Sequence, residues 1–154
     1  MQEKVTANSK PDLISVELSS RRTGMSFQRT RMSADRTLMS VIRTSLSLIG
    51  FGFTIFQFFQ KLKEGSVLEG GAHAARNFGL ALVSLGIAML VLGIIYHLQF
   101  MLGLRIERNQ MTEDGLIHGE GRFPPSLTLI TAAILLVIGV AAIVSMTFQV
   151  GPFG

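Results

Sequence analysis

Apolar residues are gathered into three long segments, and polar residues separate these segments. Residues 44–60, 77–104 and 127–154 contain no Asp, Glu, Lys or Arg. A helix needs about 20 mostly apolar residues to cross the hydrocarbon core of a bilayer. The pattern predicts an all-α integral membrane protein with three transmembrane helices. We expect the spans at about residues 39–59, 78–102 and 127–150.

The segments outside the spans complete the predicted organisation. Residues 1–32 mix Ser, Thr, Arg and Lys with few large apolar side chains, so we expect a disordered basic cytoplasmic tail. Residues 33–104 make up a two-helix region, and residues 105–126 a cytoplasmic loop. The loop ends in Pro-Pro-Ser at 124–126. This sequence supports the start of the third span there, because proline is tolerated where a helix begins.

Basic residues are divided unevenly between the two sides of the membrane that three spans define. The segment through Arg36 holds seven Lys and Arg residues and the second loop (103–126) holds three, which makes ten on one side. The first loop (60–77), on the other side, holds three. Because cytoplasmic loops carry the excess of Lys and Arg, we expect a cytoplasmic N-terminus and an outside C-terminus. The predicted location is the plasma (inner) membrane.

The composition argues against several classes of function. The 154-residue chain is 48% hydrophobic and 16% charged, whereas about a quarter of the residues of a soluble domain are charged. It has no cysteine, and its three histidines fall in three segments, so we expect no disulfide and no metal site. We find no phosphate-binding glycine loop and no catalytic constellation, so we expect neither an enzyme nor a cofactor. The net charge of +4 reflects topology rather than binding to nucleic acid.

Small and polar residues recur along the first span at alternating steps of four and three. At about 100° per residue, they lie within about 60° of one line along a helix. Two interpretations stay open. The face packs dryly against another helix while its basic ends reach lipid phosphates, or it faces water and anions inside a bundle. We call this set the polar stripe, and its members are Arg36, Ser40, Arg43, Ser47, Gly50, Thr54, Gln57 and Lys61.

Glycines mark a face of the second span. Gly79, Gly86 and Gly93 recur every seven residues, and His97 extends their line. Glycine at this spacing lets another backbone come close, so we expect helix packing at these positions and at Gly50. We interpret His97 as a hydrogen-bonded histidine at that interface, and the third span as a supporting helix.

Two Arg-Thr pairs, Arg36-Thr37 and Arg43-Thr44, stand seven residues apart before a glycine-bearing apolar run. This stretch resembles the opening of the DUF202 family, approximately N-E-R-T-x-L-A-W-x-R-T-x-L. The family includes YidH-like bacterial inner-membrane proteins and the small three-helix subunit of the eukaryotic vacuolar transporter chaperone complex. Ala34-Asp35 and Val41 stand here in place of the family's Asn-Glu and Trp.

The resemblance implies a function for the basic residues. In the eukaryotic complex, basic residues of the first helix line a path for polyphosphate, and the matching positions here are Arg36 and Arg43. We therefore expect a homo-oligomer whose first helices surround a common axis, with a phosphate-rich anion as its partner. Rings of Arg36 and of Arg43 would lie about 10 Å apart along the axis. Their repulsion would need anions, water or a carboxylate such as Asp35 to offset it.

Two other functions stay open at this point. A non-conducting scaffold or accessory subunit would use its tail and second loop to recruit a cytoplasmic partner. The basic tail would alternatively bind anionic membrane lipid.

Overall fold

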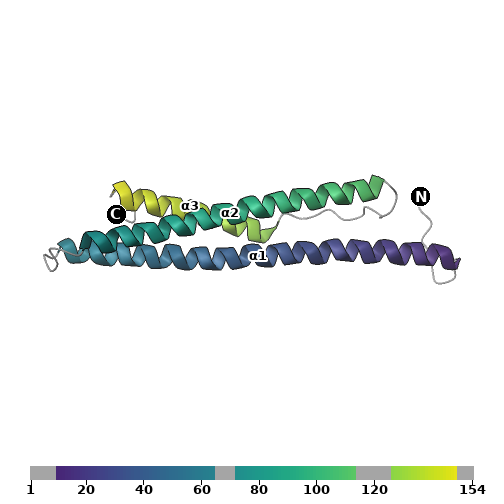
Figure 1. Ribbon diagram of the computed structural model, residues 1–154, viewed down its shortest axis with the longest axis horizontal. Coiled ribbons are helices and arrows are strands. Elements are labelled where there is room, and N and C mark those ends of the chain that lie inside the picture. The colour runs from purple at the N-terminus through teal and green to yellow at the C-terminus, as the bar shows by residue number, and fades with distance from the viewer. Residues whose placement is uncertain (1–9, 65–71, 114–125, 149–154) are drawn as a thin grey trace. The chain divides into compact units, whose positions relative to one another are not determined.

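The computed structural model describes residues 10–64, 72–113 and 126–148, which form three α-helices (Figure 1). Each helix is long and apolar enough to cross a membrane. The chain is therefore an all-α protein with three transmembrane helices, as the sequence predicts. The helices are α1 (Pro11–Glu64), α2 (Ala72–Glu113) and α3 (Leu127–Phe148).

Helix α1 begins far ahead of the predicted first span. The Lys10 carbonyl accepts hydrogen bonds from the backbone N–H groups three and four residues on, at 3.0 and 3.2 Å. Pro11 thus takes the first helical position, and Asp12 lies in the first turn, where a carboxylate is favoured. The prediction of a disordered tail is wrong for residues 11–32, while residues 1–9 lie outside the described part of the chain.

The polar composition of this segment does not prevent a helix. Glu17 Oε1 accepts a hydrogen bond from Arg21 Nε at 2.8 Å, one turn later, and such pairs add a few tenths of a kcal/mol to a helix. Serine and threonine side chains bond to backbone carbonyls one turn before them, as Thr30 does to Ser26 at 3.0 Å. No proline interrupts the chain between Pro11 and the end of α1.

The other helix ends also differ from the predicted spans. Helix α2 continues to Glu113, so the predicted loop at 105–126 is helical over residues 105–113. These nine residues contain no glycine or proline, and the first glycine after them is Gly115. Helix α3 ends at Phe148. Residues 114–125 and the last two residues of the predicted third span lie outside the described part of the chain.

The chain divides into two compact units, one formed by Met1–Ala34 with Leu98–Pro124 and the other by Asp35–His97 with Pro125–Gly154. We call the second the three-helix unit, because α1, α2 and α3 all contribute to it. Its core consists of two apolar clusters. Buried members of these clusters are Leu38, Ile42, Leu90 and Ala132 in the first, and Ile49, Phe56, Val83 and Met146 in the second.

Helices α1 and α2 come into backbone contact at two glycines. A Cβ added at Gly79 would lie 2.7 Å from the Gly52 carbonyl oxygen, and one added at Gly52 would lie 2.6 Å from the Gly79 carbonyl oxygen. Both distances are shorter than real Cβ contacts, so the two backbones touch where neither residue has a side chain. This crossing is the reason for glycine at both positions.

The other two glycines of the predicted line also face α1. A Cβ at Gly86 would lie 2.9 Å from Ile49 Cγ1, and one at Gly93 would lie 2.6 Å from Val41 Cγ1. Along this line, residue numbers fall on α2 as they rise on α1, so the two helices run antiparallel. Gly139 brings α3 to the same place, since its Cβ would lie 3.2 Å from Ile49 Cδ1.

Gly50 does not pack as expected. A Cβ there would have no atom of the described chain within 4 Å. Gly50 and Gly52 are about 200° apart around α1, so they lie on opposite faces. Gly52, which does not belong to the polar stripe, makes the close contact with α2.

Candidate functional site

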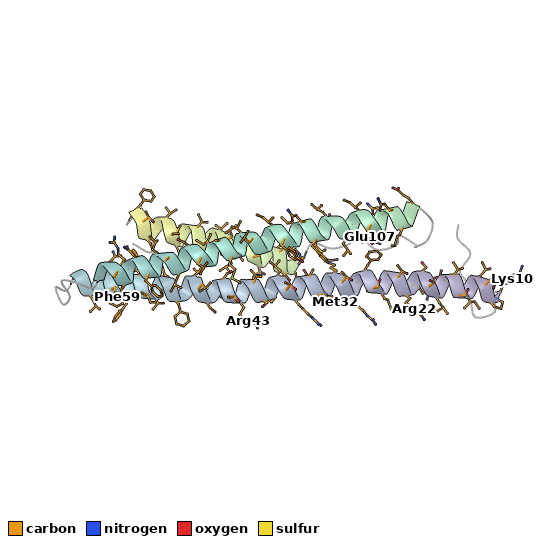
Figure 2. All side chains as sticks on the ribbon, viewed as in Figure 1. Lys10, Arg22, Met32, Arg43, Phe59 and Glu107 are labelled. Atoms are coloured by element: carbon orange, nitrogen blue, oxygen red, sulfur yellow. The ribbon has the colours of Figure 1, made fainter. Side chains whose placement is uncertain are left out.

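The polar stripe lies on the face of α1 that points away from α2 and α3. The buried α1 residues Leu38, Ser45 and Phe56 lie about 180° around the helix from it. In Figure 2 the labelled Arg43 side chain extends from α1 on the side away from the other two helices. Seven stripe residues are exposed in the three-helix unit, namely Arg36, Ser40, Arg43, Ser47, Gly50, Thr54 and Lys61, and Gln57 is half-buried.

Two hydroxyl groups of the stripe donate hydrogen bonds within α1. Ser47 Oγ donates a hydrogen bond to the Arg43 carbonyl oxygen at 3.0 Å, and Thr54 Oγ1 donates to the Gly50 carbonyl oxygen at 2.8 Å. Each hydroxyl therefore spends its one proton inside α1 and retains acceptor positions on its oxygen. The charged groups of the stripe, in contrast, extend from the helix surface.

This placement limits the dry-packing interpretation of the stripe to contacts with a second molecule. Dry packing of the stripe against another helix of the same chain does not occur, because α2 and α3 cover the opposite face of α1. The stripe must meet lipid, water or a second molecule. A guanidinium near the middle of a bilayer costs at least about 2.5–3.5 kcal/mol. Arg43 lies about 10 Å further along the helix axis than Arg36 and deeper in the predicted span. Exposure of Arg43 to lipid would therefore cost more free energy than exposure of Arg36.

A second group of polar residues joins all three helices. Ser126 precedes α3, and its carbonyl accepts the first helical hydrogen bonds, from Leu129 N at 3.1 Å and Ile130 N at 3.3 Å. Its side-chain Oγ donates a hydrogen bond of 2.6 Å to Asp35 Oδ1 on α1. A short bond to a carboxylate is among the stronger hydrogen bonds in proteins. The carboxylate also lies at the N-terminus of α3, where the helix dipole favours negative charge.

The same carboxylate faces a buried histidine of α2. Asp35 Oδ1 lies 3.5 Å from His97 Nε2, which is longer than an ordinary N–H···O hydrogen bond. His97 is only 3% exposed, and neither ring nitrogen has a hydrogen-bond partner among the described residues. The expectation of an interface histidine is right, but the expectation that it is hydrogen-bonded is wrong. We call Asp35, His97 and Ser126 the junction triad.

The junction triad differs from a nucleophile and its base. In a Ser-His-Asp triad the histidine takes the serine proton. Here the carboxylate lies between the other two residues and accepts the serine proton itself. Among the described residues, no group of three or more His, Cys, Asp and Glu side chains could hold a metal ion.

Asp35 does not lie among the stripe arginines, whose repulsion a carboxylate such as Asp35 was expected to offset. Its side chain bonds to Ser126 on the inner side of α1, whereas its neighbour Arg36 is exposed on the outer side. The carboxylate is therefore committed to the junction rather than placed among the arginines of the stripe. Any charge that offsets Arg36 and Arg43 must come from outside this face.

The hydrogen bond between Ser126 and Asp35 offers a direct test of the junction. We expect Ser126→Ala to lower the free energy of unfolding by about 1.5–3 kcal/mol, because a hydrogen bond to a charged group is lost. In a double-mutant cycle with Asp35→Ala, measured by unfolding in detergent, the two effects should couple by more than 0.5 kcal/mol. Strictly additive effects would contradict the contact.

Residues 29–103 match the family model described as Domain of unknown function (DUF202). These residues form a DUF202 domain. The match covers the region in which the Arg-Thr pairs of the sequence resemble that family. No curated protein and no solved structure matches the chain.

The DUF202 domain contains the whole polar stripe, the glycines of α2 and two members of the junction triad, Asp35 and His97. Ser126 and α3 follow the domain along the chain. Together with the three apolar helices, the domain identifies a multi-pass membrane protein. Sequence reasoning missed the link from Asp35 to Ser126. Two features of the sequence could have indicated this link, namely the Pro-Pro-Ser sequence before the third span and the acidic residue Asp35 next to Arg36.

Proposed function

We propose that this DUF202 protein is a homo-oligomer in which the polar stripes of several chains line a path for phosphate-like anions. The supporting observation is that the stripe occupies the face of α1 opposite its own core. One three-helix unit cannot enclose a lumen with that face. Several copies with α1 toward a common axis would bring the stripes together and leave the outer surfaces to lipid.

The outer surface of α3 fits such an arrangement. Helix α3 contains no charged residue, and its exposed side chains include Leu127, Val137 and Phe148. Such a surface suits lipid, whereas the stripe does not. The proposal therefore places α1 at the axis and α3 at the periphery. We also propose that the protein lies in the plasma (inner) membrane with its N-terminus in the cytoplasm, because Lys and Arg are in excess on that side of the predicted spans.

Electrostatics indicates which solutes such a path would accept. Two arginines of neighbouring chains, about 10 Å apart at an effective dielectric constant of 20, repel by about 1.7 kcal/mol. The Asp35 carboxylate bonds to Ser126 rather than lying on the stripe, and the stripe itself contains no acidic residue. Rings of basic side chains are a means by which pores select anions. The rings of Arg36 and Arg43 would be stabilised by the anions that occupy them.

The number of chains per particle is the first test. We expect native mass spectrometry of the detergent-purified protein to give particles of several identical chains. Gly50→Leu should reduce assembly, because Gly50 lies on the stripe with open space around it. Ala141→Leu, an equal change on the exposed face of α3, should leave assembly intact. A wild-type monomer would contradict the proposal.

Transport is tested in vesicles that contain the reconstituted protein. We expect inorganic tripolyphosphate to cross these vesicles faster than it crosses protein-free vesicles, and choline to show no such difference. Equal tripolyphosphate flux in both vesicle types, with the oligomer intact, would favour the alternative function.

The alternative is a non-conducting scaffold that recruits a cytoplasmic partner. It is favoured by the unit formed by Met1–Ala34 and Leu98–Pro124, in which α1 presents basic residues beside exposed apolar ones. Exposed Leu18, Met25 and Met32 recur every seven residues on that part of α1. Deletion of residues 1–32 should then abolish capture of the partner. Capture by the shortened protein would contradict this alternative.

A further inference from the structure

A second patterned band lies on α1 ahead of the polar stripe, in the unit formed by Met1–Ala34 and Leu98–Pro124. Apolar and basic residues alternate along this band at steps of four, three, four and three. At about 100° per residue, all five lie within about 80° of one another around the helix. We call this set the basic seam, and its members are Leu18, Arg22, Met25, Arg29 and Met32.

The basic seam lies on the face of α1 opposite the buried side of this unit. Ser20 and Phe27 are buried, and they lie about 180° around the helix from the seam. The three apolar members of the seam are between 53% and 58% exposed, and both arginines are exposed as well. The apolar side chains of the seam are therefore not used in the packing of their own unit.

The charges of the seam are also unbalanced. The seam contains no acidic residue, and neither Arg22 nor Arg29 forms an ion pair with another described residue. The neighbouring Arg21 differs, because its Nε lies 2.8 Å from Glu17 Oε1 on the same helix. Arg22 and Arg29 are seven residues apart, which is about 10 Å along the helix axis. A molecule with acidic groups at that spacing, beside apolar groups, would complement the seam.

The spacing favours a helix as the binding molecule. Alternating steps of three and four give a mean repeat of 3.5 residues, which is the repeat of the contact between two packed helices. A helix that lies in a membrane surface has instead a broad apolar face, with its charges on the opposite side. In the seam, arginines and apolar residues share one narrow band, and the residues exposed beside it are Ser26, Gln28 and Ser33. The seam therefore suits a partner helix better than a bilayer surface.

The seam of a second copy would not be a suitable partner. Two seams packed together would bring four arginines close to one another without an acidic residue, and like charges repel. Charged residues beside the apolar contact of two helices form ion pairs across it and thereby determine which partner binds. Arginine and a carboxylate form such pairs with good geometry, since two N–H groups can donate to the two oxygens.

We propose that the basic seam is the docking surface for an acidic amphipathic helix of another protein. The partner helix carries an apolar residue and an Asp or Glu residue once in every seven positions. Its apolar side chains pack on Leu18, Met25 and Met32, and its carboxylates bind Arg22 and Arg29. The proposal does not rest on the anion path, because docking is measured in detergent without transport.

The probe is a synthetic helical peptide of three seven-residue repeats, with Leu and Glu each at one position of every repeat. Its binding to the full-length protein in detergent is measured by the fluorescence anisotropy of the labelled peptide. We expect saturable binding that weakens as the salt concentration rises. A peptide of the same composition, in which Leu and Glu are shuffled out of the repeat, should bind much more weakly. Equal binding of the two peptides would overturn the proposal.

A charge exchange tests the contact itself. Arg29→Glu should weaken binding of the acidic peptide about fivefold, because a repulsion replaces an attraction between exposed charges. The same variant should bind a peptide with Lys in place of Glu more tightly than the wild type does. Arg105→Glu, an equal charge change at an exposed position of α2 in the same unit, is the matched control and should change neither affinity. Wild-type affinities of Arg29→Glu for both peptides would contradict the docking surface.

Two further measurements test the other occupants, a bilayer and a second copy. The chain has no cysteine, so Ser26→Cys gives a single attachment point for a fluorophore beside the seam. In nanodiscs that contain phosphatidylglycerol, nitroxides on the lipid acyl chains should not quench this fluorophore. Quenching would assign the seam to the membrane surface, and a changed number of chains per particle in Arg29→Glu would assign it to a second copy. Either result would overturn the proposal.

Discussion

Arg43→Ala is expected to lower the flux of tripolyphosphate through reconstituted vesicles at least tenfold. A guanidinium and one anionic charge 5 Å apart interact by about 3 kcal/mol at an effective dielectric constant of 20. A barrier raised by about 1.4 kcal/mol, which is less than half of that energy, lowers a rate tenfold. Arg43 lies inside the predicted first span, whereas Arg36 precedes it. Water is therefore less able to take over the interaction of the Arg43 guanidinium with the anion.

Two control variants separate charge from structure in this experiment. Arg43→Lys keeps the positive charge and should retain most of the flux. Arg105→Ala removes another exposed arginine, this one on α2, and it should change the flux little. Arg43 itself faces away from the core, so the alanine variant should keep its melting temperature and its number of chains. Unchanged flux through an intact Arg43→Ala oligomer would refute the anion path.

Gly79→Leu is expected to destabilise the three-helix unit by about 3 kcal/mol or more. Its Cβ would lie 2.7 Å from the Gly52 carbonyl oxygen and 2.9 Å from Phe56 N, both of which belong to the α1 backbone. Backbone atoms cannot turn aside as a flexible side chain does, so α1 and α2 must separate. Overpacking of a core commonly costs 1–3 kcal/mol and sometimes more. The measurement is thermal or denaturant-induced unfolding in detergent.

Gly103→Leu is the matched control for that variant. Gly103 also lies on α2, but a Cβ there would have no described atom within 4 Å. Leucine forms helices better than glycine by almost 1 kcal/mol, so this variant should be as stable as the wild type or more stable. Equal stability of the two variants would show that α1 and α2 do not cross at Gly79.

The spans could be predicted from the sequence because each depends on a local property, a long run without charge. The helix ends could not be predicted in the same way. Outside the bilayer, helix formation depends on capping and on the absence of proline and glycine. The charged stretch before Gly115 contains neither residue, and the polar stretch after Pro11 contains no further proline and a single glycine, Gly24. Polarity alone does not distinguish a helix in water from a loop.

The candidate site divides in a similar way. Periodicity predicted that the stripe shares one face, since that needs only the geometry of a single helix. It did not predict which face the other helices cover, and for this reason Gly50 was chosen over Gly52. The bond from Ser126 to Asp35 joins residues 91 positions apart. Nothing local in either segment specifies the other, because the pairing is made by the packing of α1 against α3.

Helix α1 has its packing residues and the residues of the polar stripe on opposite sides. Leu38, Ile42 and Phe56 hold the chain together, while Arg36 and Arg43 stand outside that packing. Substitutions on the outer side can therefore accumulate without unfolding the protein, and each would alter only what the surface meets. Descendants of one ancestral helix trio could diverge widely in their ligands while their interiors stayed nearly constant. A protein engineer could use the same separation to exchange the charges of the stripe on an unaltered scaffold.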